Sequence, residues 1–436
     1  MKTKKVNIVT LGCSKNLVDT EFLIRQLEAS GIEVRHNSNS FEAKIAVINT
    51  CGFILDAKEE SIDTILRFSE AKKQGLIEKI LVIGCLSERY KEELQKEIPE
   101  IDGVFGKFQQ KEVVQYLKAD YNTKIRNERT TTTPKHYAYL KISEGCNRTC
   151  SFCAIPQMTG KHVSKPVEDL IAEANYLTSK GAKELLIIAQ DLSYYGLDLD
   201  KKTNKLAFLL QELEKIDKIQ WIKLHYAYPA KFPHDILPLI ASSKKICSYL
   251  DIALQHISDN MLTKMRRNIS KQATYDLIKN IRTQIPDIAL RTSLLVGHPG
   301  ETKQDFKELM KFVQDIRFER LGVFTYSHEE ETFAYKNYTD DVSEETKEER
   351  KDAIMNIQQK ISYENNIQRI GTVQKVIVDR EEKDFFIGRT QYDSPEVDGE
   401  VLISKKDKTI RPGQFYKVNI TNANDYDLYG EIFSPA

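Results

Sequence analysis

Glu144-Gly-Cys-Asn-Arg-Thr-Cys-Ser-Phe-Cys153 is the stretch that decides how the middle of this chain folds. Its cysteines, Cys146, Cys150 and Cys153, have the spacing C-x3-C-x2-C and follow Ala138–Ser143, an apolar run typical of a β-strand. Thiols on a loop just past a strand can converge on one side. A structural zinc site or an electron-transfer cluster normally uses four ligands, so three cysteines predict a four-iron cluster with one iron left open.

A zinc knuckle is the alternative interpretation of this motif. Its fourth ligand would have to come from elsewhere, with His162 and Cys247 as candidates, and neither has the spacing of zinc ligands. Cys247 lies in a Lys-Lys-Ile-Cys-Ser stretch that favours a helix. We therefore expect Cys247 to pack in the interior rather than to bind metal.

The middle of the chain alternates strands and helices from this motif onward. Helical stretches include Val167–Ser179, Leu206–Lys215, Ser270–Thr283 and Lys303–Ile316. The predicted strands are Ala138–Ser143, Glu184–Ala189, Trp221–Tyr226, Tyr249–Leu254, Ala289–Val296 and Arg320–Tyr326. Six successive strand–helix units predict a partial (βα)6 barrel, a TIM-like barrel without two of its units, in which the chemistry lies at the carboxyl ends of the strands.

The N-terminal segment also alternates strands and helices, and predicts a doubly wound parallel sheet covered on both faces. Its helices are predicted at Asn16–Ala29, Ala57–Gln74 and Glu88–Glu97. Its strands are predicted at Val6–Leu11, Ile45–Asn49, Ile80–Ile83 and Gly103–Phe105. The pattern ends near Ala119, and residues 120–134 form a polar linker.

The C-terminal segment changes to a β pattern after a long charged helix at about Ser343–Ile367. Short β-rich runs at Val373–Val378, Phe385–Thr390, Gly399–Ile403 and Phe415–Ile420 predict a small antiparallel β-barrel. The fold class is therefore α/β, with domains at residues 1–119, 132–367 and 368–436.

A second cysteine set lies in the N-terminal domain. Cys13, Cys51 and Cys85 each come one step past the carboxyl end of a predicted parallel strand. That edge is where open α/β sheets bind ligands, so these thiols can converge on a second cluster with its own open iron. One such cysteine alone would more often be a small buried residue, but three at equivalent strand ends favour a site.

Composition and charge restrict the environment of the protein. The 64 basic and 64 acidic residues cancel, so net charge gives no general attraction to nucleic acid or to membranes. Val6–Leu11 is too short for a signal peptide, and no run approaches the roughly 18 apolar residues of a membrane span. We expect a cytoplasmic protein without a membrane partner, where clustered thiols bind metals rather than form disulfides.

The central motif resembles the signature of the radical S-adenosylmethionine enzymes. The resemblance implies that S-adenosylmethionine chelates the open iron, that one electron cleaves it to a 5′-deoxyadenosyl radical, and that Phe152 lies against the adenine. Packing beneath the loop is the alternative for Phe152. By the same resemblance, strand residues Gln190, Gln255 and Arg291 are candidates for holding the methionine and ribose, although they can instead bond only backbone. Gly297 and Gly300 would allow close approach near the adenine.

The whole chain is similar to the methylthiotransferases, a family with a three-cysteine domain, a radical barrel and a C-terminal TRAM domain. Gly388-Arg-Thr390 lies where that family has its Gly-Arg-Thr segment. The resemblance implies two 4Fe–4S clusters and two uses of S-adenosylmethionine. One molecule methylates a sulfur at the Cys13/Cys51/Cys85 cluster, and the other generates the radical that removes hydrogen from the substrate carbon. Reduced flavodoxin or ferredoxin would supply electrons.

Two branches of that family differ in substrate, one modifying adenosine in transfer RNA and the other an aspartate of small-subunit ribosomal protein number twelve. The motifs resemble the second branch, and they are Tyr137–Gly145, Ala189-Gln-Asp191, Tyr195-Gly196, Tyr326-Ser-His-Glu-Glu330, Asp393–Gly399 and Tyr426-Asp-Leu-Tyr429. From Arg369 to Ala436, ten Lys and Arg oppose twelve Asp and Glu, so the charge is 10 − 12 = −2.

A domain that binds transfer RNA should be basic, because it must neutralise phosphates. An acidic C-terminal domain therefore favours binding of the ribosomal protein and makes transfer RNA an unlikely partner. An acidic solvated surface without a partner is the plain alternative. The transfer RNA enzyme and a noncatalytic iron–sulfur sensor stay as alternative functions.

Two residues depart from the family pattern, namely Thr159, where arginine is common, and His298, where phenylalanine is usual.

Overall fold

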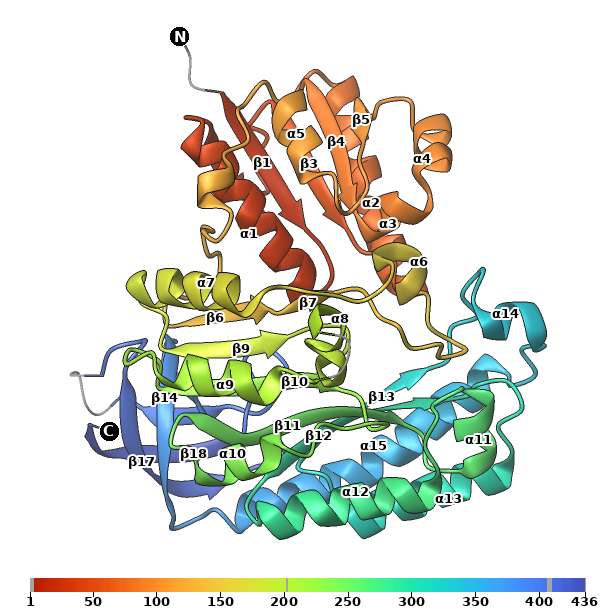
Figure 1. Ribbon diagram of the computed structural model, residues 1–436, viewed down its shortest axis with the longest axis vertical. Coiled ribbons are helices and arrows are strands. Elements are labelled where there is room, and N and C mark those ends of the chain that lie inside the picture. Colours follow the sequence, from red (N-terminus) through yellow and green to blue (C-terminus); the bar gives the residue numbers. More distant parts are fainter. Residues whose placement is uncertain (1–3, 201–202, 406–409, 436) are drawn as a thin grey trace.

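A computed structural model describes residues 4–200, 203–405 and 410–435 of the chain. Figure 1 shows an N-terminal α/β layer, a curved central sheet with its helices, and a small C-terminal β-barrel. The N-terminal layer lies over one side of the central sheet, and the small barrel lies beside the ends at which the central strands begin. The predicted α/β class with a C-terminal β-barrel is confirmed.

The N-terminal sheet is parallel, with strand order β2-β1-β3-β4-β5 in the described residues. The strands are β1 (Lys5–Thr10), β2 (Glu33–His36), β3 (Ile45–Thr50), β4 (Lys79–Gly84) and β5 (Gly103–Val104). The helices are α1 (Ser14–Ala29), α2 (Leu55–Lys73), α3 (Cys85–Arg89), α4 (Lys91–Glu97) and α5 (Gln110–Tyr116). Strand β2 is absent from the sequence prediction because this short edge strand, Glu-Val-Arg-His, carries only one apolar side chain.

The segment after α5, predicted as a polar linker, is anchored to both neighbouring parts. A 3₁₀ turn, η1, covers Thr123–Ile125. Beyond it, the buried guanidinium of Arg129 donates to Glu21 on α1, to Glu173 of the central region at 2.9 Å, and to the backbone oxygen of Tyr139. A buried arginine with two carboxylates fixes the N-terminal layer to the central sheet.

The central sheet is a partial barrel of parallel strands in sequential order, from β6 to β13, in the described residues. The strands are β6 (Tyr137–Lys141), β9 (Glu184–Ile188), β10 (Trp221–Ala227), β11 (Ile246–Gln255), β12 (Ala289–Val296) and β13 (Arg320–Thr325). The long helices are α7 (Val167–Ser179), α9 (Leu206–Glu214), α12 (Lys271–Gln284), α13 (Lys303–Ile316) and α15 (Glu344–Ile367). The predicted (βα)6 arrangement is confirmed.

Shorter elements complete the central region at the ends of these strands. They are the pair β7 (Ser143–Glu144) and β8 (Val163–Ser164), with helices α6 (Ile155–Thr159), α8 (Leu197–Asp200), α10 (Ile236–Ser242), α11 (Asp259–Lys264) and α14 (Phe333–Asn337) and the turn η2 (Leu192–Tyr194). Most of them follow the carboxyl ends of strands, where Figure 1 places α6, α11 and α14 on one side of the molecule.

The two faces of the central strands have different partners. One face packs against the barrel helices through a large apolar cluster that includes Leu140, Leu185 and Leu224. On the opposite, inner face, Tyr139 and Leu186 pack against Val18 of α1. Helix α1 of the N-terminal layer therefore covers the inner face of the first two barrel strands.

Cys247 occupies a strand rather than the helix that its sequence favours. It is the second residue of β11, and it is buried in an apolar cluster with Trp221, Ile377 and Phe415. The lysines before it belong to the turn into the strand, so the expected helical context is wrong. The expectation that Cys247 packs in the interior agrees with its burial.

The C-terminal barrel is closed in the order β14-β15-β16-β18-β17. Its strands are β14 (Val373–Glu381), β15 (Phe385–Thr390), β16 (Val401–Ser404), β17 (Phe415–Ala423) and β18 (Leu428–Pro435). The pairing of β16 with β18 is parallel and the other pairings are antiparallel. Strand β18 is absent from the sequence prediction because it contains Gly430 and ends at Pro435; at Gly430 an added Cβ would lie 2.4 Å from Val418.

A buried ion network joins the C-terminal barrel to the start of the central strands. Glu184 on β9 accepts from Lys223 and from Arg389, each at 2.7 Å, and all three side chains are almost fully buried. Arg389 also pairs with Asp379, whose other partner is His136 at 2.7 Å. The arginine of the Gly388-Arg-Thr390 segment therefore holds two parts of the fold together.

This network predicts a pH-dependent stability. Burial alone would raise the pKa of Glu184, but Arg389 and Lys223 outweigh burial and lower it from 4.5 to about 2. A depressed pKa adds stability above pH 4.5 that is lost as the pH falls through 2. We expect Glu184→Gln to lower the free energy of unfolding by about 3–5 kcal/mol at pH 7 and to flatten its fall between pH 4.5 and 2.

Urea unfolding at pH 7 and pH 3, followed by circular dichroism, measures this effect. The exposed Glu92→Gln is the matched control, and we expect it to change stability by less than about 0.5 kcal/mol. Equal stability of Glu184→Gln and the unsubstituted protein at pH 7 would refute the prediction.

Candidate active site

The first cysteine set lies on the loop that follows β7. All three thiols are partly buried. The sulfur of Cys146 accepts from the backbone N–H of Arg148 at 3.4 Å, and Cys150 Sγ lies 3.1 Å from a guanidinium nitrogen of Arg267. Burial raises the pKa of Cys146 to about 11, and burial together with the other two thiols raises the pKa of Cys153. The three thiols are thus close enough to affect one another, and their thiolates need positive charge nearby.

Arg267 and Arg148 supply that positive charge. Their guanidinium groups lie 4.1 and 4.0 Å from the centre of the Tyr228 ring, which both arginines contact. The Tyr228 hydroxyl lies 3.7 Å from Cys150 Sγ, and Arg148 also pairs with Asp191 at 2.7 Å. Sequence reasoning missed these residues. Arg148 lies inside the cysteine motif and could have been found, but nothing in the sequence near Arg267 marks it.

Phe152, a half-buried residue of the cysteine loop, packs against the apolar cluster that includes Met261 and Leu295. Its ring is 6.4 Å from that of His298. The side chain therefore packs as the plain alternative expects, and its contact with adenine stays a prediction.

The two departures from the family pattern both have local partners. His298 is buried, its Nε2 lies 2.9 Å from Ser151 Oγ, and burial lowers its pKa to about 4, so the ring is neutral. Thr159, at the end of α6, is buried and donates its hydroxyl to the backbone oxygen of Ile155.

Gln190 and Gln255 lie at the carboxyl ends of barrel strands. Gln190 follows β9 and donates to Glu144, and its own oxygen is buried without a hydrogen-bond partner in the described ranges. Gln255 ends β11 with a φ of +70°, a backbone conformation that is uncommon outside glycine. Both residues are therefore near the level of the cysteine loop.

Arg291 is not brought together with these residues. It lies near the amino end of β12, where it pairs with Asp398 at 3.2 Å and with Asp251 at 3.5 Å. It lines a cavity of about 320 Å³ between β13, α15 and the C-terminal barrel. In the structure Arg291 joins strand β12 of the central sheet to the C-terminal domain.

The glycines proposed to approach the adenine make room for lysine side chains of this chain. Gly297 and Gly300 have φ of +76° and +74°. A Cβ added to Gly297 would lie 2.2 Å from Lys347, and one added to Gly300 would lie 2.0 Å from Lys264.

The second cysteine set lies at the carboxyl edge of the N-terminal sheet. Cys13 precedes α1, Cys51 follows β3, and Cys85 opens α3 directly after β4. Gly12, with φ of +82°, allows the strands to approach, since a Cβ there would lie 2.7 Å from Cys51 Sγ. Cys51 and Cys85 are buried, whereas Cys13 is exposed. The fold therefore brings together three cysteines that are more than 30 residues apart in sequence.

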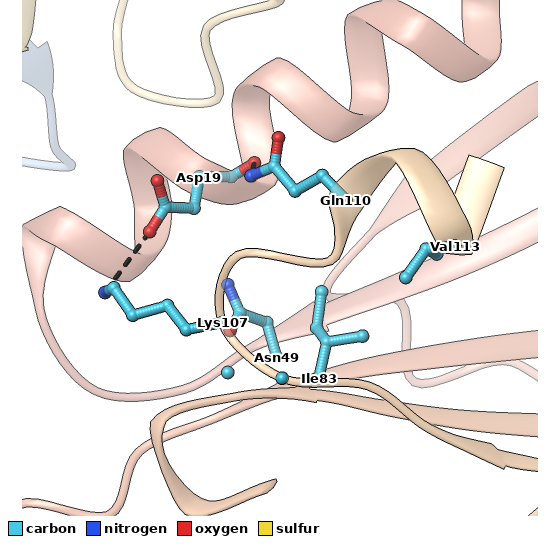
Figure 2. A pocket seen from close by; sticks show the side chains of 8 residues that line it. Asp19, Asn49, Ile83, Lys107, Gln110 and Val113 are labelled. Carbon is cyan, nitrogen blue, oxygen red and sulfur yellow. Dashed lines mark hydrogen bonds and ion pairs between the residues drawn. The ribbon is translucent and has the colours of Figure 1, made fainter. Parts of the chain in front are cut away.

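A lysine network controls the charge around these thiols. Burial raises the pKa of Cys85 to about 12, with Lys107 opposing and the other two thiols adding to the rise. The ammonium of Lys107 lies 3.9 Å from Cys85 Sγ, 3.3 Å from Asp19 and 3.5 Å from Glu144. Figure 2 shows Lys107 paired with Asp19, to the left of Asn49 and Ile83. Burial opposes its charge, but these anions raise the pKa of Lys107, so it stays cationic.

The two cysteine sets are neighbours. Cys85 packs against Ala154 and Met158, with Ile155 alongside, and these residues directly follow Cys153 in the chain. Helices α3 and α6 carry this contact. The edge of the N-terminal sheet therefore faces the loop of the first cysteine set (Figure 1).

An ion-pair cluster fixes the far side of this contact. Glu329, buried after β13, pairs with Lys58 at 2.8 Å and with Arg89 at 3.3 Å. Arg89 also donates to the backbone oxygen of Glu330, and the hydroxyl of Tyr90 donates to the Glu330 carboxylate. The Tyr326-Ser-His-Glu-Glu330 motif thus joins the end of the barrel to the N-terminal layer.

Both cysteine sets have the donors that an iron–sulfur cluster needs. Each thiolate of such a cluster binds a different iron, and in the described residues no group of three His, Cys, Asp or Glu is close enough to hold a single ion. Arg267 and Lys107 supply cations beside the two sets, and Nε of Arg267 has no partner within the described chain. His162, the alternative zinc ligand, has its Nε2 3.0 Å from Ser164 Oγ instead.

Family models match three segments of the chain. The Radical SAM superfamily matches residues 140–313, the TRAM domain matches residues 370–433, and the Uncharacterized protein family UPF0004 matches residues 5–106. Within residues 4–200, 203–405 and 410–435, each helix is too short or too polar to cross a membrane.

Curated relatives match over nearly the whole length. The chain is 55% identical over 434 residues to the ribosomal protein uS12 methylthiotransferase RimO of Bacteroides thetaiotaomicron, covering 100% of this chain and 99% of that protein. The proteins of the same name from Porphyromonas gingivalis and Cytophaga hutchinsonii are 53% and 54% identical. The alignment with the Porphyromonas gingivalis protein covers 99% of this chain and 100% of that protein. The alignment with the Cytophaga hutchinsonii protein covers 98% of each.

Solved structures share the fold at low sequence identity. The radical S-adenosylmethionine methyltransferase TsrM from Kitasatospora setae aligns with TM-score 0.53 and 14% identity, over 74% of this chain and 73% of that one. The cobalamin-dependent S-adenosylmethionine radical enzyme OxsB aligns with TM-score 0.52 and 13% identity, over 83% of this chain and 56% of that one.

Proposed function

The chain belongs to the family of ribosomal protein uS12 methylthiotransferases RimO, and we propose that it adds a methylthio group to the β-carbon of an aspartate of that ribosomal protein. It is a radical S-adenosylmethionine enzyme that uses an iron–sulfur cluster. We place its auxiliary-cluster domain at residues 1–119, its radical domain at 132–367 and its TRAM domain at 368–436.

The contact between the two cysteine sets carries this proposal. Sulfur transfer needs a place that makes a radical and a place that supplies sulfur, within reach of the same substrate atom. Cys146, Cys150 and Cys153 form the first, and Cys13, Cys51 and Cys85 form the second, so we propose two 4Fe–4S clusters. The packing of Cys85 on Ala154 and Met158 supports this arrangement.

An aspartate β-carbon carries no proton acidic enough for a general base, which is why radical chemistry is required. When bound, the clusters and two molecules of S-adenosylmethionine supply the methylthio group and the radical that removes hydrogen from this carbon. The chain supplies position and charge. Arg267 contacts Cys150, Lys107 lies beside Cys85, and the rings of Phe152 and His298 pack edge to face beside the loop. Gln190 and Gln255 are our candidates for contacts to S-adenosylmethionine.

The C-terminal domain is our candidate for binding the ribosomal protein. Its excess of acidic over basic residues suits a basic ribosomal protein better than the phosphates of transfer RNA. A reduced flavodoxin or ferredoxin is the proposed electron donor.

Mass spectrometry of uS12 and of bulk transfer RNA, from cells with and without this gene, tests the function. We expect the mass of one methylthio group on an aspartate of uS12 only when the gene is present, with transfer RNA unchanged. An unmodified uS12 together with an altered adenosine in transfer RNA would establish the nucleic-acid substrate instead. A protein that forms no 5′-deoxyadenosine with dithionite and S-adenosylmethionine would be a sensor.

A further inference from the structure

Lys15 lies where a substrate carboxylate would have to be held, and we propose that its ammonium binds the carboxylate of the target aspartate. This inference rests on the proposed function, because it concerns the substrate of that same site. In this proposal Lys15 is the residue that makes the enzyme select an aspartate rather than a neutral side chain or a nucleobase.

Lys15 reaches from the second cysteine set to the inner face of the barrel. It lies in the first turn of α1, two residues after Cys13, and its side chain is half-buried. Its ammonium lies 3.4 Å from the centre of the Tyr226 ring. Because Tyr226 is near the carboxyl end of β10, the cation stands at the junction of the N-terminal layer and the barrel.

Other cations around the two cysteine sets already have anionic or sulfur partners. Arg148 pairs with Asp191, and Arg267 donates to Cys150. Lys107 and Lys141 share the carboxylates of Asp19 and Glu144.

Lys15 differs from those four cations. In the part of the chain that the structure describes, its ammonium makes neither an ion pair nor a hydrogen bond, and its one recorded contact is the face of an aromatic ring. A ring face stabilises the charge, and the N–H donors that point away from the ring stay available to a carboxylate.

The aromatic support is itself held in an unusual conformation. Tyr226 has a φ of +66°, which is rare for a bulky residue and persists only where the surroundings enforce it. Its backbone N–H donates to the buried carboxylate of Asp251 at 3.3 Å, and Asp251 is held in turn by Arg291. The ring also packs against the buried cluster to which Val18 of α1 and Tyr139 belong. In this conformation the ring lies under the ammonium of Lys15.

The position suits the chemistry of an aspartate. Its β-carbon is bonded directly to its carboxylate carbon, so a cation that fixes the carboxylate also fixes the atom that reacts. Lys15 is the second residue of α1, whose N-cap is Cys13. A carboxylate bound there would present its β-carbon beside the second cysteine set, where the methylthio group is supplied. An asparagine or a nucleobase offers no anion to this cation.

Equilibrium binding of uS12 and of uS12 with the target aspartate changed to asparagine tests the role of Lys15. The enzyme is used as the full chain with its clusters and S-adenosylmethionine, and binding is measured by isothermal titration calorimetry. We expect the unsubstituted enzyme to prefer the aspartate protein by about tenfold or more, the usual size for a charge-assisted hydrogen bond. Lys15→Met should reduce that preference to less than about twofold, and Lys15→Arg should keep most of it.

Lys79→Met is the matched control. Lys79 is an exposed lysine 5.1 Å from the ring of Tyr116, but it starts β4, at the opposite edge of the N-terminal sheet from the cysteines. We expect this variant to keep the full preference for aspartate. Iron content and circular dichroism show whether each variant is folded and loaded, and Lys15→Gln replaces Lys15→Met if the latter is not.

Retention of the full preference by a folded Lys15→Met or Lys15→Gln protein would overturn the inference. Equal binding of both uS12 forms by the unsubstituted enzyme would also overturn it. Failure of the proposed function gives a different result, since the unsubstituted enzyme would then leave uS12 unmodified.

Discussion

Replacing Cys150 by alanine is expected to stop the cleavage of S-adenosylmethionine. Cys150 is one of three thiols on the central loop, and its sulfur is the acceptor that Arg267 contacts at 3.1 Å. Removing it leaves two cysteines for the cluster and a buried guanidinium without its sulfur partner. Because loss of a residue that merely supports a metal ligand costs about 10–100-fold, loss of the ligand should lower the rate of 5′-deoxyadenosine formation by more than about 100-fold.

Chromatography of 5′-deoxyadenosine after reduction with dithionite measures this rate, and iron analysis reports the loss of the cluster. Cys247→Ala is the matched control, because Cys247 is buried in an apolar cluster at the start of the barrel strands. We expect it to cost about 1 kcal/mol of stability and to leave cleavage unaffected. Cleavage at the normal rate by Cys150→Ala would contradict the assignment of the first cluster.

Replacing Cys51 by alanine is expected to separate the two halves of the reaction. The variant should lose methylthio transfer to uS12 by more than about 100-fold, while 5′-deoxyadenosine still forms within about twofold of the normal rate. The physical reason is that Cys51 belongs to the sulfur-supplying set and lies outside the packing of Cys85 on Ala154 and Met158. Its removal therefore leaves the radical-forming loop in place.

Mass spectrometry of uS12 and chromatography of 5′-deoxyadenosine, run on the same reaction, give the two rates. Iron content should fall from about eight to about four atoms per chain, because one of two four-iron clusters is lost. Unchanged methylthio transfer, or unchanged iron content, would refute the proposal that Cys13, Cys51 and Cys85 hold a cluster.

Apolar periodicity was sufficient to predict most of the fold. The strand at Ala289–Val296 and the helices at Val167–Ser179 and Lys303–Ile316 have the predicted bounds, because long elements with one buried face repeat their pattern several times. The prediction failed where the pattern is short or interrupted. Strand β2 has a single apolar side chain, and β18 contains glycine and proline.

The candidate site was predictable only in part. Both cysteine sets stand out in the sequence, one by close spacing and the other by equivalent positions after strands. Arg267 and Lys107 do not, because their importance depends on neighbours more than 20 residues away in the chain. Arg291 is the opposite case. Its position on a strand suggested a contact to the cofactor, but in the structure its side chain pairs with Asp398 of the C-terminal domain.

The sequence by itself determined the chemistry that this protein can hold, since the spacing of the central cysteines and the position of each other cysteine just after an apolar run are local properties of the chain. It also determined the class of each domain through the period of its apolar residues. The tertiary structure alone decided that Cys85 packs against the loop of Cys153 and that Lys15 lies on Tyr226. Such contacts join residues about 70 to 210 positions apart, and they form only when whole elements dock through buried side chains, which no local pattern records.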